Sequence, residues 1–284
     1  MEQARKVEMV SNNATCEWLA KQYGIKGTPI LSCLSSISFP SSFPFDFIHL
    51  IWENLIPNLI LFWTGKFKDL DHQGKDYVIE PRIWDEVGAA TAACSATIPV
   101  AFGAPVPNMA GKRSYMSAEM YANWTLYIAP IVLRGRFKKP QYYKHFMRLV
   151  ELLKLCLVFE ISEAILNQLD EGFRLWVQDY ENEHSSFPLT YYTQIDNRLY
   201  HENDPARLST CSLTVHALLH IVWGIRVAGP VWTYWAYPME RHCNTLLLSI
   251  KSRCHPYASI NSFVTATAQL DQIRPLYDIH EALL

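Results

Sequence analysis

The stretch PQYYKHFMRLVELLKLCL, residues 140–157, decides the fold class. Apolar side chains recur in it at every third or fourth position, with charged side chains between them, which is the pattern of an amphipathic helix. Pro140 suits the first turn of that helix, because a proline there loses no hydrogen bond. The apolar face comprises Tyr142, Phe146, Leu149, Val150, Leu153, Cys156 and Leu157, and the charged face comprises Lys144, Arg148, Glu151 and Lys154. We therefore expect a mainly α-helical protein.

Helix signals continue on both sides of this stretch. An acidic helix, in which Arg174 is the one basic residue, is predicted from about Ser162 to Tyr180. A short helix that Asn13 or Thr15 caps should end at Gly24, and Ser117 can cap another. The further helices are expected over 48–63, 81–94, 118–133, 209–227, 234–250 and 258–272.

The chain divides into five segments by composition. A polar connector that contains Pro188 and Pro205 is the expected boundary between subdomains. The segments are an irregular lead-in with a short helix at 1–42, a helical segment at 43–183, the connector at 184–207, a C-terminal helical segment at 208–275 and a tail at 276–284.

Composition narrows the function classes. Half of the 284 residues are apolar and 18% are charged, so a globular core is expected. The net charge of −2 gives no overall attraction to nucleic acid, and no GxGxxG or Walker motif indicates nucleotide binding. Seven cysteines without a CxxC pair indicate reduced thiols. The polar N-terminus and the absence of a long apolar run predict an intracellular protein without a membrane span.

Four stretches carry a resemblance to a known family. They are FPFDFIHLIWEN at 43–54, DYVIEPRIWDEVGAATAACSATIPVAFG at 76–103, KKPQYYKHFMRLVELL at 138–153 and GPVWTYWAYPMERHC at 229–243. In this order the chain resembles, over roughly residues 10–275, the catalytic domain of CACTA-type (En/Spm-like) DNA transposases of fungal type. The first stretch is similar to the family segment that bears the second acidic residue of the DDE triad, with Ile48-His49 where Met-His is usual.

The resemblance implies a fold and a site. The fold is a truncated RNase H-like domain with a large helical insertion and few strands. Asp46 and Glu240 are the implied catalytic residues and metal ligands, and we expect them to converge. His49, His216 and Arg241 are the implied pocket residues. The partner would be the DNA of the transposon ends, the location would be nuclear, and self-association is left open.

The implied chemistry depends on Mg²⁺. Two ions roughly 4 Å apart activate the attacking group and stabilise the leaving oxygen, and Mg²⁺ prefers oxygen ligands, as carboxylates supply. No counterpart of the first catalytic Asp of the family precedes residue 43. We therefore expect a fragment or relic that is catalytically incomplete.

A basic stretch lies inside the helical insertion and could contact DNA phosphates. It consists of Arg134, Arg136, Lys138, Lys139, Lys144 and Arg148. The alternative is a solvated helix face beside the acidic helix.

The other residues have alternatives as well. Asp46 could simply cap the helix that follows, and Glu240 could form an exposed ion pair with Arg241. Cys211, His216 and His220 could form a zinc site, although a fourth ligand is not evident in the sequence. The aromatic residues of 232–237 could be core rather than base-stacking groups. The whole chain could be a co-opted helical module that binds protein or DNA without catalysis.

Overall fold

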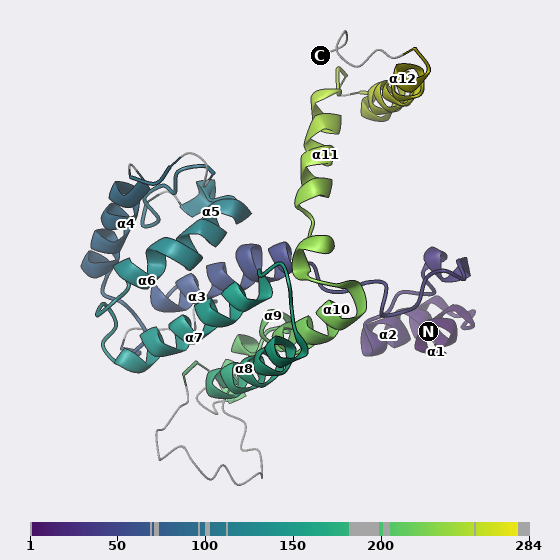
Figure 1. Ribbon diagram of the computed structural model, residues 1–284. Helices are drawn as coiled ribbons and strands as arrows, with labels where there is room; N and C mark the ends of the chain where they lie inside the picture. Colours follow the sequence, from purple (N-terminus) through teal and green to yellow (C-terminus); the bar gives the residue numbers. More distant parts are fainter. Residues whose placement is uncertain are drawn as a thin grey trace. The chain divides into compact units, whose positions relative to one another are not determined.

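The computed structural model describes residues 2–68, 70, 74–95, 97–99, 103–111, 113–181, 199–200, 205–252 and 254–277. The chain forms two compact units, Met1–Tyr234 (unit 1) and Trp235–Leu284 (unit 2). Figure 1 shows the helices of both units. The connector expected at 184–207 lies largely outside the described residues.

The protein is mainly α-helical, as the sequence predicts. Helix makes up 68% of it, and the described residues contain no β-strand, so the few strands expected are not found among them. The α-helices are α1 (Glu2–Glu8), α2 (Asn13–Tyr23), α3 (Ile56–Trp63), α4 (Pro81–Ser95), α5 (Ala118–Asn123), α6 (Ala129–Val132), α7 (Pro140–Cys156), α8 (Glu163–Glu181), α9 (Leu213–Ala217), α10 (Ile221–Ala228), α11 (Tyr237–Leu248) and α12 (Pro256–Tyr277). The π-helices are η2 (Ile48–Leu55) and η5 (Trp124–Ile128), and the 3₁₀ turns are η1 (Ile30–Cys33), η4 (Arg113–Tyr115), η6 (Pro205–Thr210), η7 (Leu218–His220) and η8 (Val231–Thr233).

The helix expected over 48–63 is the buried centre of unit 1. Its first half is the π-helix η2 and its second half is α3. π-helical turns are uncommon and often occur near functional sites. Here the Asn54 side chain donates a hydrogen bond to the His49 carbonyl at 2.6 Å. Helices α5 and α9 pack against η2.

Helices α7 and α8 pack against each other, and two buried side chains, one from each helix, bond to the backbone carbonyl of the other residue. His145 Nε2 lies 3.1 Å from the Trp176 carbonyl oxygen, and Trp176 Nε1 donates to the His145 carbonyl at 3.0 Å. The two rings stack with their centroids 4.2 Å apart. Burial lowers the pKa of His145 to about 3, so the imidazole is neutral at physiological pH.

A cluster of aromatic side chains fixes α3 to the other helices of unit 1. Trp63 packs edge-on against Phe146 of α7 and donates from Nε1 to the Tyr200 hydroxyl at 3.0 Å. The buried Arg207 guanidinium donates to the Tyr200 carbonyl at 2.8 Å and to the Tyr77 hydroxyl at 2.5 Å. These bonds satisfy polar groups that would be costly to bury without partners.

Several predicted helix ends are confirmed. Ser117 caps α5 by accepting a hydrogen bond from the Met120 N–H, and Pro140 lies in the first turn of α7. Gly24 ends α2 in the left-handed conformation. The N-cap of α2 is Asn12, so the prediction of Asn13 or Thr15 as the cap was wrong by one or more residues.

The helix expected over 209–227 is broken in the structure. It consists of η6, α9, η7 and α10, and the 3₁₀ turn η7 separates α9 from α10. The helices expected over 234–250 and 258–272 are α11 and α12 of unit 2. No residue of either helix is buried.

Among the described residues, no single helix is both long and apolar enough to cross a membrane. The stretches Leu213–Ala228 and Val231–Leu248 pass that test only when they are taken together.

Candidate functional site

Asp46 lies two residues before the start of the buried helix η2 and makes two contacts with His49. Its Oδ2 accepts a hydrogen bond from the backbone N–H of His49 at 2.9 Å, as the carboxylate of a helix N-cap does. The same oxygen lies 2.5 Å from His49 Nδ1. The hydrogen bond from the His49 N–H is of the kind expected if Asp46 caps the helix that follows. The side chain is still 25% exposed, so capping leaves the carboxylate accessible to a cation.

A second carboxylate lies on the same face of η2. Glu53 follows His49 by one helical turn, and its Oε2 lies 3.6 Å from His49 Nε2. The imidazole therefore stands between two carboxylates, with Nδ1 toward Asp46 and Nε2 toward Glu53. His49 is 51% exposed and Glu53 43%, so the three side chains form an open row. Such a row can orient a carboxylate and offer oxygen ligands to a cation.

Unit 1 brings His216 and His220 to the same region from a distant part of the chain. Helix α9, which carries His216, packs against η2. Phe45, the neighbour of Asp46, stacks on the His220 ring with the centroids 6.1 Å apart. The two histidines themselves approach to 3.2 Å between their Nε2 atoms.

Tyr234 also reaches the start of η2. Burial raises the pKa of its hydroxyl, and the nearby Cys156 and Asp46 add to the effect. A side chain at Gly224 of α10 would lie 3.4 Å from both the Tyr234 hydroxyl and Pro44. The close packing at Gly224 therefore keeps Tyr234 next to the segment that leads into Asp46.

Half of the predicted basic stretch is engaged in ion pairs. Arg136 pairs with Glu86 at 2.8 Å, Lys139 Nζ lies 2.5 Å from Asp76, and Arg148 pairs with Asp179 of α8. Arg134, Lys138 and Lys144 are exposed and form no ion pair with the part of the chain that is described. Within the described ranges, three of the six cations are thus available to meet another anion.

Glu240 and Arg241 belong to unit 2. Both are exposed in the first turns of α11, which begins with Tyr237 and Pro238. The backbone N–H of Glu240 donates to the Ala236 carbonyl at 2.8 Å. Asp46 belongs to unit 1, and its convergence with Glu240 stays a prediction.

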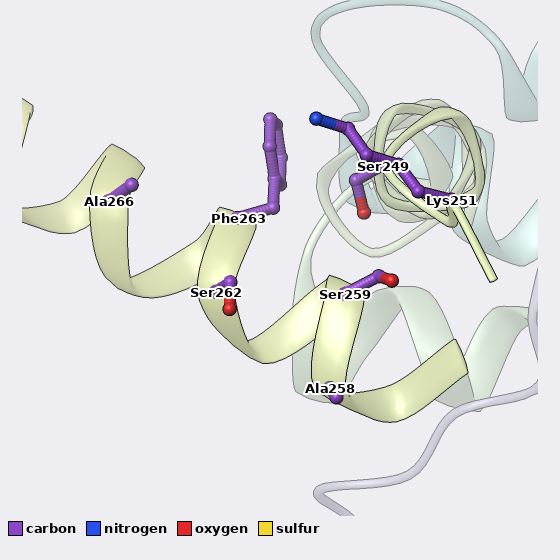
Figure 2. A pocket seen from close by; sticks show the side chains of 7 residues that line it. All are labelled: Ser249, Lys251, Ala258, Ser259, Ser262, Phe263 and Ala266. Atoms are coloured by element: carbon purple, nitrogen blue, oxygen red, sulfur yellow. The ribbon is translucent and has the colours of Figure 1, made fainter. Parts of the chain in front are cut away.

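Unit 2 has a pocket of its own, of about 540 Å³, between the end of α11 and the start of α12. Figure 2 shows the Lys251 and Phe263 side chains pointing toward each other and Ser259 and Ser262 on α12. Lys251 is the one ionisable side chain in this lining, so the pocket has no pair of groups for acid–base chemistry.

Only two of the three residues considered as zinc ligands lie together. His216 and His220 lie together, whereas Cys211 lies beside Thr210, with the sulfur 4.0 Å from the Thr210 hydroxyl. Within the described residues of unit 1, no third His, Cys, Asp or Glu joins the histidine pair. A closed four-ligand structural zinc site is therefore not formed by these residues.

The places of two side chains in this region were not predicted from the sequence. Glu53 could have been found, because it follows His49 by four residues, one helical turn. Tyr234 has no local signal, because its position near Asp46 results from tertiary packing.

Comparison with protein-family models, with curated proteins and with solved structures finds no match to this chain.

Proposed function

We propose that the chain is part of a DNA strand-transfer domain of the CACTA transposase type, in which Asp46 and Glu240 are two of the three metal-binding carboxylates. The proposal includes the RNase H-like ancestry of the fold and the Mg²⁺ dependence of the reaction. Its main support is the carboxylate of Asp46, which His49 holds in a fixed orientation at the solvent-accessible end of a buried helix.

Asp46 fits a Mg²⁺ ligand on chemical grounds. Its carboxylate supplies hard oxygen atoms, and a carboxylate has enough lone pairs to accept from His49 and to bind a cation as well. When bound, the ions would activate the attacking hydroxyl and stabilise the leaving oxygen. The part of His49 is to orient Asp46, since a ligand held by a neighbouring hydrogen bond loses less freedom on binding.

The resemblance assigns only two of the three carboxylates to this sequence. Two carboxylates position a pair of ions poorly, so the chain by itself should not cleave DNA. Addition of a fragment of a related transposase that bears the first Asp should restore Mg²⁺-dependent nicking of DNA that carries transposon ends.

That rescue tests the two residues directly. It should vanish in Asp46→Asn and in Glu240→Gln, which keep the shape but remove an anionic ligand. The matched control is Glu17→Gln, an exposed carboxylate of α2 outside the proposed site. Cleavage by the chain alone, or rescue that survives both substitutions, would contradict the assignment.

Contact with DNA should use the three cations that form no ion pair with the described part of the chain. If Arg134, Lys138 and Lys144 each meet a phosphate, their joint replacement by Ala should reduce the slope of log K against log salt by about 0.9 per contact. The control is the joint replacement of Lys21, Lys26 and Lys66, exposed lysines that give the same change in charge. Equal slopes in both variants would favour a solvated face without DNA.

A second candidate function, a helical interaction module without catalysis, is supported by unit 2. Helices α11 and α12 bury none of their residues and expose large apolar side chains. Those side chains are Met239, Leu247, Leu248, Tyr257, Phe263, Val264, Leu270, Ile273, Leu276 and Tyr277. A cellular role that is lost in Phe263→Ser and Ile273→Ser but retained in Asp46→Asn would favour this function over strand transfer.

A further inference from the structure

His216 and His220 present two ring nitrogens to each other at the surface of unit 1. Both residues are exposed, and their Nε2 atoms lie 3.2 Å apart although the rings are inclined by 71°. His216 lies in α9, whereas His220 ends the 3₁₀ turn η7, which is wound more tightly than an α-helix. The two nitrogens are therefore arranged by a specific local backbone.

Two neutral imidazole nitrogens at this distance can share either one hydrogen or one cation. The separation matches a cation of suitable size. Two metal–nitrogen bonds of about 2.05 Å at a tetrahedral angle place the nitrogens roughly 3.3 Å apart, and at a right angle roughly 2.9 Å apart. The observed 3.2 Å lies between these values and close to the tetrahedral one.

The His220 ring is also supported from outside the helix. Phe45 stacks on it with an angle of 29° between the planes, and this contact restricts the rotation of the ring. A ligand held in this way loses less side-chain freedom when a metal binds.

We propose that His216 and His220 form a bidentate site for a divalent transition ion of the Zn²⁺, Ni²⁺ and Cu²⁺ class. Water would complete the coordination shell, since the described part of unit 1 supplies no third side-chain ligand. Imidazole nitrogen suits these ions, whereas Mg²⁺ and Ca²⁺ prefer oxygen. The site does not depend on the proposed strand-transfer function, which requires carboxylates and Mg²⁺.

The test is calorimetric titration of the full chain with Ni²⁺. Cys33, Cys243 and Cys254 are exposed, and thiols are metal ligands, so these cysteines are first alkylated. Circular dichroism of each variant verifies that the helices are retained. Mg²⁺ is titrated in parallel and should give no heat that depends on these two histidines.

His216→Gln and His220→Gln should each lower the Ni²⁺ association constant by about tenfold or more, because each removes the second attachment of an ion that the other ring holds. The double variant lacks both rings. Its Ni²⁺ association constant should fall below that of the weaker single variant by no more than the contribution of one imidazole. His242→Gln, an exposed histidine of α11, is the control and should bind as the parent does.

Three results would overturn the proposal. A loss in only one of the two single variants would indicate a single imidazole ligand. A loss in His49→Gln but in neither of them would place the ion on the row of Asp46, His49 and Glu53. A loss of the same size in His242→Gln would indicate nonspecific binding to surface histidines.

Discussion

Acidification should destabilise unit 1 through one buried histidine. His145 of α7 packs against α8, is 2% exposed and bonds to the Trp176 carbonyl. Burial lowers its pKa to about 3, from about 6.5 in an unfolded chain. Between these two values the unfolded state binds a proton that the folded state does not. Stability is therefore lost as the pH falls below about 6.5, and the loss ends near the folded pKa.

The size of the effect follows from the two pKa values. Each pH unit well inside the window costs about 1.4 kcal/mol. The unfolded imidazole is only half protonated at pH 6.5, so the step from pH 6.5 to 4.5 should remove roughly 2.3 kcal/mol. His145→Gln keeps an amide N–H that can reach the Trp176 carbonyl but does not titrate. The variant should lack this part of the pH dependence, whatever its stability at neutral pH.

The assay is urea unfolding followed by tryptophan fluorescence at several pH values from 7.5 to 4.5. The carboxylates titrate equally in the parent and in His145→Gln. The difference between the two slopes of unfolding free energy against pH therefore reports on His145 alone. His255→Gln, an exposed histidine of unit 2, serves as the control. Parallel curves for the parent and His145→Gln would refute the argument, because they would mean that the buried imidazole accepts its proton without cost.

The remaining predictions concern packing and reactivity. Gly88→Ala should lower the unfolding free energy, measured by thermal unfolding, by about 1–3 kcal/mol, because the added Cβ would lie 2.2 Å from Asn108 Oδ1. The control is Gly111→Ala, whose Cβ would meet no atom within 4 Å and which should change the stability little. Thr125→Val should be neutral or stabilising by up to about 1 kcal/mol, since the buried Thr125 hydroxyl has no hydrogen-bond partner among the described residues; a clear loss in urea unfolding would contradict this. Burial raises the pKa of the Cys156 thiol, so native protein at pH 8 should leave Cys156 unmodified by iodoacetamide until it unfolds, which peptide mass mapping would show.

Local signals predicted most of the helices. Pro140, Ser117 and Gly24 mark helix ends because proline, an N-cap hydroxyl and a left-handed glycine act on the backbone within one turn. The π-helical turns η2 and η5 have no such signal. The break at η7 was not predicted either, since apolar periodicity does not distinguish an α-helix from a short 3₁₀ turn inside it.

The surroundings of the candidate site were less predictable. The contact of Asp46 with His49 spans three residues and is contained in the local sequence as a capping pattern. Tyr234 and His220 come from far along the chain, so only the packing of α9 and α10 places them near Phe45 and Asp46. The ion pairs of the basic stretch also join residues far apart in the sequence. The sequence alone therefore overstates the number of cations available to DNA.

The two uses of Asp46, helix cap and metal ligand, can be separated because they depend on different properties of the side chain. Capping needs an acceptor for the His49 N–H, and an asparagine carbonyl supplies one almost as well as a carboxylate. Binding of Mg²⁺ needs negative charge, which asparagine lacks. Asp46→Ala should therefore cost about 1 kcal/mol of stability, whereas Asp46→Asn should cost much less. Since Asp46→Asn leaves the helix intact, a loss of metal-dependent activity in it reports on the carboxylate itself. If Asp46→Asn destabilised the chain as much as Asp46→Ala, the contact with His49 Nδ1 would depend on the negative charge. Capping and metal binding would then need the same property and could not be separated by this substitution.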